Sequence, residues 1–275
     1  MALIELPQPY DFDLSTERFR AFGPDLACRW HDGALHRVVR GREVRIAPAP
    51  GGVEVEPHDP WLEAETRVLL GLPFDLDAFA GWAARGDPVL AAIVARLRGF
   101  RPPLQPDPWE ALVTSITAQQ VSLHAAFAIR GRLVERFGVR HEHAWAFPAR
   151  ERLAAARAEE IVAGGFSRRK AEYLGDLARS DLDLDALAAL SDDEVREAIT
   201  AVRGLGEWTA DWFLARHLGR PHAWPAGDLA LRKAVSVLYG DGEALTTEEV
   251  RRMGERFAPF QNLTAHYVLL AGRVP

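Results

Sequence analysis

The sequence is poor in cysteine and has no long apolar run. Cys28 is the only cysteine, which excludes a disulfide within the chain and any four-cysteine zinc or iron–sulfur site. No window approaches the roughly 18 uninterrupted apolar residues of a membrane-spanning helix. Residues 1–10 lack the basic start and apolar stretch of a secretion signal. These absences favour a cytoplasmic protein that does not enter a membrane.

Positive charge is also scarce. The formal net charge is −6, which argues against a protein that coats nucleic acid through bulk electrostatics. Lys170 and Lys233 are the only lysines. Arginines cluster at residues 96–101 and 168–169, and each cluster is either a solvated helix face or a local anion-binding surface. At 275 residues and 48% hydrophobic composition, the chain can hold one large domain or two modest ones.

The pattern of the chain changes near residue 60. Short, partly alternating runs at 26–30, 35–39, 43–47 and 53–56 predict strands, and the glycine turns at 32–33 and 51–52 predict hairpins. From residue 60 onward, apolar residues recur at helical spacing, which predicts helices over 61–70, 76–84, 88–97, 109–121, 123–137, 168–179, 228–239, 247–257 and 259–271, besides those at 192–200 and 207–218. We therefore expect a small antiparallel α+β domain over 1–59 and an all-helical domain over 60–275. Prolines at 102, 103 and 106 interrupt the helices, which leaves open two helical subdomains with a cleft between them.

The most informative run is Val202-Arg203-Gly204-Leu205-Gly206-Glu207-Trp208-Thr209-Ala210. It lies between predicted helices at 192–200 and 207–218, so it predicts a tight turn that exposes amides at a helix N-terminus. Such amides bind an anion, a DNA phosphate in particular. Glycine suits this place because it accepts positive φ and because no Cβ holds the phosphate away. The alternative is a plain helix–helix turn without a ligand.

A single carboxylate, Asp228, follows Gly206 by 22 residues. It begins an apolar stretch, so a simple helix N-cap is the structural alternative to a functional acid. A carboxylate beside a sugar stabilises the positive charge that grows when an N-glycosidic bond breaks. Each feature alone is usually structural. The hairpin, the acid and the tryptophan at 208 together favour a DNA-binding turn with an acid placed near it.

These motifs resemble the helix–hairpin–helix DNA glycosylase superfamily, and within it the bacterial DNA-3-methyladenine glycosylase II type. The resemblance covers nearly the whole chain and includes three further segments, at 8–12, 109–123 and 165–171. It implies a mainly α fold with a small N-terminal antiparallel α+β domain. It also implies a DNA glycosylase that hydrolyses the N-glycosidic bond of alkylated bases, 3-methyladenine among them, in base excision repair.

The resemblance assigns roles to particular residues. Asp228 matches the catalytic aspartate, and Gln120 lies where the family places the wedge that fills the gap left by a flipped base. The hairpin residues expected to bind the DNA backbone are Arg203, Gly204, Gly206 and Thr209. The aromatic residues expected to form the base pocket are Trp208, Trp212 and Phe19. The alternative for Gln120 is a polar surface residue, and for the two tryptophans a buried helix.

The family also includes enzymes that cut the strand with a lysine two residues after the second hairpin glycine. Trp208 stands there, so we expect water to be the nucleophile and an abasic site to be the product. No organic cofactor or catalytic metal is implied, although hairpin carbonyls in this superfamily can hold a monovalent cation. The expected partner is double-stranded DNA with damaged bases, and a monomer suits the superfamily.

Two positions depart from the family pattern. Leu269 stands where an aromatic residue is frequent, and Gly227 precedes the catalytic acid where the neighbour is often acidic. Both predict a wider or less aromatic pocket and leave the range of bases open. Two other functions remain as alternatives: a glycosylase for oxidised or deaminated bases, and a non-catalytic hairpin module that only binds DNA.

Overall fold

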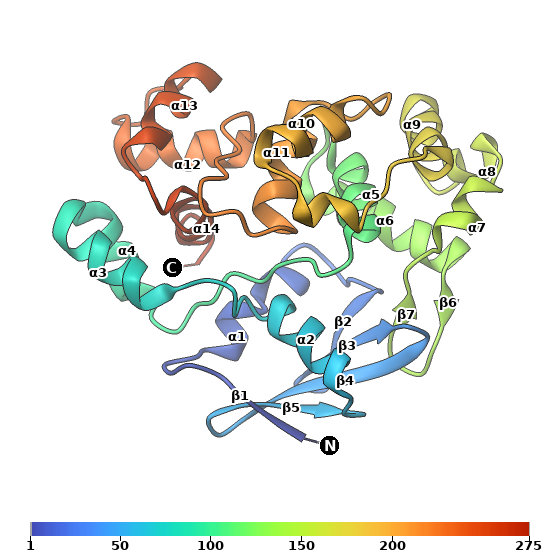
Figure 1. Cartoon of the computed structure of the whole chain (residues 1–275), viewed down its shortest axis with the longest axis horizontal. Coiled ribbons are helices and arrows are strands. Elements are labelled where there is room, and N and C mark those ends of the chain that lie inside the picture. The colour runs from blue at the N-terminus through green and yellow to red at the C-terminus, as the bar shows by residue number, and fades with distance from the viewer. Residues whose placement is uncertain (1, 275) are drawn as a thin grey trace.

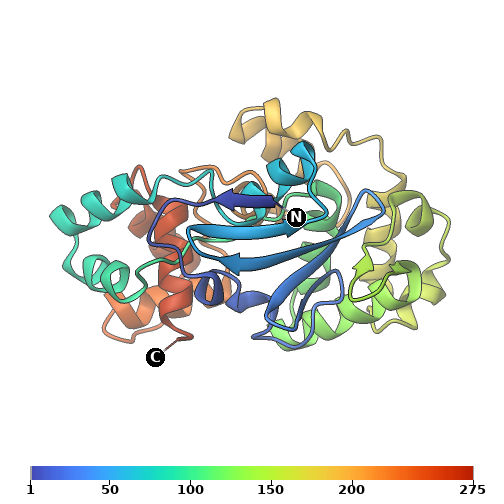
Figure 2. The ribbon, with the colours of Figure 1, turned by 90° about the horizontal axis from the view of Figure 1, so that it is seen from below.

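A five-stranded antiparallel sheet forms the N-terminal layer of the computed structural model, which describes residues 2–274 (Figures 1 and 2). The strand order is β1-β5-β4-β3-β2. The strands are β1 (Ala2–Glu5), β2 (Cys28–His31), β3 (Ala34–Val39), β4 (Arg42–Ala49) and β5 (Gly52–Glu56). Strands β2 to β5 were predicted, whereas β1 was not, because it is a short edge strand with one buried side chain.

The inner face of the sheet is covered by α1 (Phe12–Ser15), a 3₁₀ turn η1 (Glu17–Phe19) and α2 (Pro60–Leu69). Helix α2 begins where Asp59 accepts a hydrogen bond from the Trp61 amide at 3.3 Å. Its apolar side chains Leu62 and Leu69 belong to the same core as the sheet. This core therefore extends beyond the predicted boundary at residue 59.

The rest of the described chain is helical, apart from a short pair of strands, β6 (Val139–Arg140) and β7 (Trp145–Ala146). Most helices begin at a Ser, Thr or Asp whose side chain caps the first turn. The helices are α3 (Leu76–Gly86), α4 (Pro88–Arg96), α5 (Pro108–Ala118), α6 (Leu123–Phe137), α7 (Arg150–Ala154), α8 (Ala158–Val162), α9 (Arg168–Arg179), α10 (Asp192–Thr200), α11 (Glu207–Arg216), α12 (Leu229–Tyr239), α13 (Thr247–Glu255) and α14 (Gln261–Ala271), with a 3₁₀ turn η2 (Ala186–Ala189).

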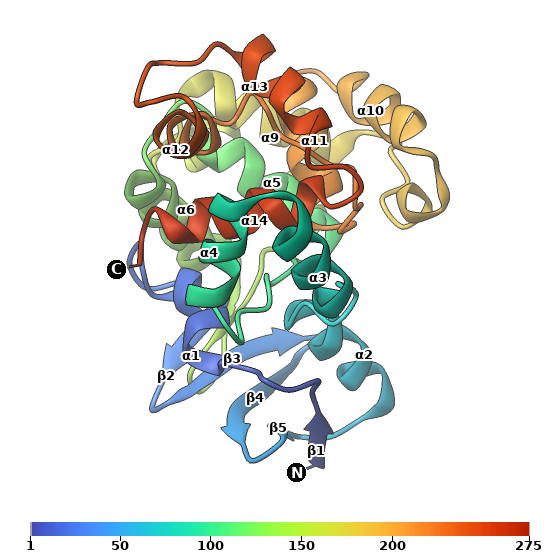
Figure 3. The same ribbon diagram turned by 90° about the vertical axis from the view of Figure 1, so that its left-hand side faces the viewer.

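The helices bury two separate cores. One lies among α5 to α11 and ends at Ala223, and the other joins α3 and α4 to α12–α14 (Figures 1 and 3). The second core resumes at Ala226, so the chain passes from one core to the other just before residue 228. Among the described residues, every helix is too short or too polar to cross a membrane.

A buried ion network fixes the sheet to the helices. Arg37 of β3 reaches Glu110 of α5 with a nitrogen–oxygen distance of 3.0 Å, and Arg130 of α6 pairs with both Glu110 and Asp25. All four side chains are at most 6% exposed. Burial disfavours the charged form of Glu110, but Arg37 and Arg130 outweigh it and hold the Glu110 pKa below its usual value. The small sheet is therefore anchored to the helical part.

Candidate functional site

The turn between α10 and α11 uses its two glycines differently. Gly204 has φ +89°, and a Cβ built there would lie 2.1 Å from the Tyr173 ring. Gly206 has φ −109°, which any residue adopts, and a Cβ there would meet open space. Gly204 is thus required by the backbone and by close packing, whereas Gly206 leaves free space at the start of α11.

The first turn of α11 presents unpaired amides. Among the described residues, none accepts a hydrogen bond from the backbone N–H of Gly206, Glu207 or Trp208. These are the donors that a helix N-terminus leaves unsatisfied, and Gly206 contributes no side chain to cap them. The surface around Gly206 therefore has the geometry and the partial positive charge of an anion site.

The two side chains predicted to bind DNA beside this anion site, those of Arg203 and Thr209, differ in their exposure to solvent. Arg203 has a 62% exposed side chain that pairs with Glu172 and Asp176 of α9 at 3.1 and 2.9 Å. It is available at the surface, but it must share its charge with those carboxylates. Thr209 is only 1% exposed, and its amide donates to the Gly206 carbonyl at 2.9 Å. Thr209 therefore lies inside the protein, not on the outer surface of the turn.

The turn between α5 and α6 lies against the hairpin. Gln119 donates from Nε2 to the Gly204 carbonyl at 3.1 Å, and Gln120 follows with φ +54° and an exposed side chain. The predicted helix over 109–121 thus ends at Ala118. No local pattern signals the role of Gln119, because its partner lies 85 positions further along the chain. The Gly204 carbonyl retains a second lone pair that a monovalent cation at the hairpin would need.

Asp228 is the N-cap of α12 and accepts a hydrogen bond from the Leu231 amide at 2.9 Å. Among the described residues, no other group donates to this half-buried carboxylate. Trp208 lies close by, with its ring Cδ1 atom 3.8 Å from where a Cβ on Gly227 would be. Trp212 is partly buried against the α5–α11 core. The fold therefore brings the predicted acid and the first tryptophan together.

Arg216 is a positive side chain that interacts electrostatically with Asp228. Burial lowers the pKa of Arg216 to about 9; repulsion from Arg18 and Arg273 acts in the same direction, while attraction to Asp228 opposes it. Arg216 donates to the ring of His266 on α14, and burial keeps the His266 pKa well below its usual value, so this imidazole is neutral and accepts. Sequence reasoning missed this group because its members come from three segments that are far apart in the chain, at residue 18, at residue 216 and at 266–273.

Two predicted residues lie in cores. Phe19 is 8% exposed and belongs to the core of the N-terminal sheet. Leu269 is partly buried against the core that contains α12 and α14. The contact of Phe19 with a flipped base stays a prediction, as does the wider or less aromatic pocket expected from Leu269.

Asp211, an acidic residue of α11, pairs with Arg196 of α10 at 3.1 Å. Burial raises the pKa of Asp211, and Arg196 partly offsets this effect. The pair joins the two helices of the hairpin.

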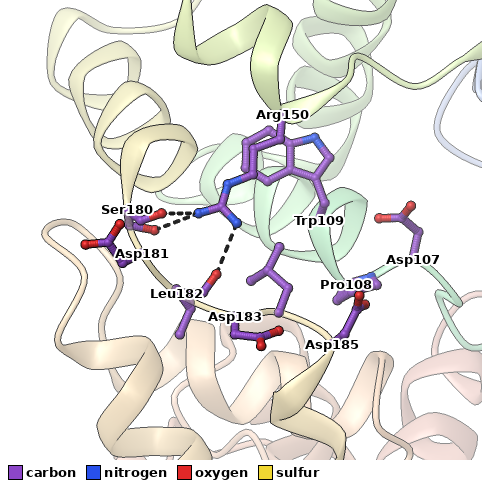
Figure 4. A pocket seen from close by; sticks show the side chains of 10 residues that line it. Asp107, Pro108, Trp109, Arg150, Ser180, Asp181, Leu182, Asp183 and Asp185 are labelled. Atoms are coloured by element: carbon purple, nitrogen blue, oxygen red, sulfur yellow. Dashed lines mark hydrogen bonds between the residues drawn. The ribbon is translucent and has the colours of Figure 1, made fainter.

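A separate cavity of about 480 Å³ lies between the start of α5 and the segment before η2 (Figure 4). Asp107, Asp181, Asp183 and Asp185 are among its lining residues, and Asp228 is not. Arg150 crosses it and donates to the Ala178 and Leu182 carbonyls at 3.1 and 3.0 Å, as Figure 4 shows for Leu182. Because Arg150 binds carbonyls at the end of α9, this cavity is a structural junction.

Comparison with known proteins agrees with the hairpin and the fold. Residues 113–259 match the HhH-GPD superfamily of base excision DNA repair proteins. The DNA-3-methyladenine glycosylase of Bacillus subtilis is 27% identical over 77% of this chain and 74% of its own length. A solved 3-methyladenine DNA-glycosylase from Archaeoglobus fulgidus superposes with a TM-score of 0.89, at 30% identity over 99% of both chains.

A third relative was solved with nucleic acid. The Schizosaccharomyces pombe 3-methyladenine DNA glycosylase in complex with abasic DNA is 27% identical, with a TM-score of 0.60 over 68% of this chain and 93% of its own. The chain described here belongs to the HhH-GPD superfamily of base excision DNA repair proteins. The fold class and the superfamily predicted from the sequence are confirmed.

Proposed function

We propose that this protein is a monofunctional DNA glycosylase that hydrolyses the N-glycosidic bond of alkylated bases, 3-methyladenine among them. The observation that carries the proposal is the position of Asp228, at the passage between the two helical cores and beside Trp208. The names of the relatives from Bacillus subtilis and Archaeoglobus fulgidus support the substrate class.

Asp228 supplies the charge that the reaction needs. When the bond breaks, the base leaves with the bonding electron pair and positive charge grows on the sugar. One carboxylate oxygen of Asp228 is held by the Leu231 amide, which leaves the other free to face the sugar or a water. The oxygen of that water adds to the sugar carbon and its proton passes to the carboxylate or to solvent. The product is an abasic site.

DNA is held at the start of α11 in this proposal. The unpaired amides of Gly206, Glu207 and Trp208 bind one backbone phosphate, and exposed Arg203 lies beside them. Thr209 contributes through its place in the turn and not through its buried hydroxyl. This arrangement needs little net positive charge, which accounts for DNA binding by a protein of net charge −6.

The damaged base leaves the helix stack to reach Asp228. Trp208, which lies beside Gly227, provides an aromatic platform for it, and an electron-rich indole attracts a positively charged alkylated purine. Gln120 lies on an exposed turn joined to the hairpin through Gln119, so it can enter the duplex where the base has left. Trp212 and Phe19 complete the proposed pocket from deeper positions.

Two observations support hydrolysis without strand cleavage. The side chain two residues after Gly206 is Trp208, which cannot form a Schiff base. Lys170 donates from Nζ to the Thr117 carbonyl at 2.9 Å and is therefore engaged away from α12, whereas Lys233 is exposed on α12.

The test incubates the protein with methylated duplex DNA. We expect release of free methylated bases, strand breaks only after heat or alkali, and no adduct on borohydride treatment. A trapped adduct on Lys170 or Lys233 would contradict hydrolysis by water. Release of the base from an 8-oxoguanine or hypoxanthine duplex, with no release from methylated DNA, would show that the substrates are oxidised or deaminated bases instead. Tight DNA binding with no base release from any duplex would show that the protein binds DNA but is not a glycosylase.

A further inference from the structure

A histidine is buried on the outer face of the sheet, where polar side chains normally meet water. Strand pairing sets His36 of β3 opposite Arg29 of β2 and Arg45 of β4, and this row faces away from the sheet's apolar core. His36 is nevertheless only 4% exposed. The loop of the β6–β7 hairpin covers it, and Figure 2 shows this hairpin beside the end of the sheet.

Three side chains of types that commonly bind metal ions meet under this loop. His36 and Glu43 come from adjacent strands, His143 comes from the hairpin loop, and one ligand atom of each lies within 4.8 Å of the others. The Nδ1 of His36 is 3.0 Å from a carboxylate oxygen of Glu43. A third imidazole, His31, stacks on His143 with ring centres 4.7 Å apart.

The carboxylate is held in place by the backbone. Glu43 accepts hydrogen bonds from the amides of His143 and Ala144 at 3.0 and 3.4 Å. Such contacts orient a ligand before a metal arrives and leave other lone pairs of the carboxylate free. Arg29, the positive side chain opposite His36 on β2, is directed to the His143 carbonyl oxygen at 3.2 Å.

We propose that His36, Glu43 and His143 bind one zinc ion, with His31 or a water as the fourth ligand. Imidazole and carboxylate are ligands that zinc prefers, and tetrahedral ligands about 2.0–2.1 Å from zinc lie about 3.3 Å from each other. The present separations require the side chains to move by about 1.5 Å at most. Zinc binds the Nδ1 of neutral His36 in place of the hydrogen bond to Glu43, and the single ring proton then resides on Nε2.

The bound ion joins two parts of the fold. His36 and Glu43 belong to the sheet, whereas His143 belongs to a hairpin inserted between α6 and α7, so zinc bridges the sheet to the helical part. The site shares no residue with the hairpin or with Asp228 and lies on the other side of the molecule from α12 (Figure 1). Its role is therefore stability, independent of the proposed glycosylase activity.

The experiment uses the full chain with any affinity tag removed, because a histidine tag binds the same metals. After chelator treatment and desalting, Zn²⁺ is titrated by calorimetry, and thermal unfolding is followed with and without the metal. We expect one ion per chain and a melting temperature raised by about 5 °C when zinc is a hundredfold above its dissociation constant. His143→Ala removes a partly exposed ligand and should weaken zinc binding at least tenfold.

His141→Ala is the matched control, because this residue lies in the same loop but outside the cluster. It should bind zinc like the wild type. Equal loss in the His141 and His143 variants, or wild-type protein that neither binds zinc nor gains thermal stability, would overturn the proposal. In that case the cluster is only a hydrogen-bonded junction centred on Glu43.

Discussion

The two hairpin glycines provide a matched pair of substitutions that separates folding from DNA binding. In Gly204→Ala the new Cβ would lie 2.1–2.4 Å from three ring atoms of Tyr173, on a backbone with φ +89°. A non-glycine residue in such a conformation costs about 1–3 kcal/mol before any packing change. The ring must also move, and overpacking of this kind costs about a further 1–3 kcal/mol. We therefore expect Gly204→Ala to destabilise the protein by about 2–6 kcal/mol.

Gly206→Ala should behave in the opposite way. Its φ of −109° is ordinary and its Cβ would meet open space, so stability should change by no more than about 0.5 kcal/mol. The methyl group nevertheless occupies the space in which a phosphate approaches the amides of α11. Affinity for all duplexes, damaged or undamaged, should therefore fall, because the phosphate contact is independent of the base.

Denaturant unfolding and fluorescence anisotropy with undamaged and abasic duplexes measure both effects. In the Tyr173→Ala background the clashing ring is absent. Adding Gly204→Ala to that variant should therefore cost less stability than adding it to the wild type. Wild-type stability in Gly204→Ala would refute the assignment of its φ and packing. Unchanged DNA affinity in a folded Gly206→Ala would refute the phosphate site.

Three further substitutions test the buried ion network between the sheet and the helices, the proposed base pocket and the proposed wedge residue. Glu110→Gln leaves Arg37 and Arg130 buried without their shared carboxylate and should cost about 3–5 kcal/mol in denaturant unfolding. The pKa of Glu110 is lower in the folded protein than in the unfolded chain. Its ionised carboxylate therefore stabilises the fold above the unfolded pKa, and this stabilisation is lost as the pH falls through the lower folded value. Below about pH 4, Glu110→Gln should therefore lose less stability with falling pH than the wild type does. Trp208→Ala should slow excision of an alkylated purine about tenfold in single-turnover assays while undamaged-duplex affinity stays within a few-fold, and equal loss of both would contradict a stacking role. Gln120→Ala should slow excision from a stable pair more than from a mismatch, and equal slowing in both contexts would make it a surface residue only.

Local patterns made much of the fold predictable. Caps such as Asp107, Ser122 and Ser191 mark helix starts, and alternating residues mark β2 to β5. The β6–β7 pair was not predicted, because two-residue strands carry no period. The end of α5 was predicted three residues late, because nothing in a glutamine at position 120 signals a positive φ.

The site was predictable only in part, because a sequence pattern shows local spacing but not which distant residues the fold brings together. The hairpin and Asp228 lie in one local stretch whose spacing can be read directly. Arg216, His266 and Arg18 come together only through tertiary packing, and the His36 cluster likewise joins residues about 100 positions apart. Thr209 matches a surface motif in sequence but is buried, because the helix turns its side chain inward.

The substitution Asp228→Asn tests the central claim most directly, because an amide oxygen can still cap the Leu231 N–H at the start of α12. The fold and the DNA affinity should therefore persist, while the charge that stabilises the transition state is lost. Single-turnover release of 3-methyladenine from duplex DNA should fall by about 10²-fold or more, with DNA affinity within a few-fold of the wild type. Near-wild-type release by the asparagine variant would show that Asp228 is a helix cap and not the catalytic acid.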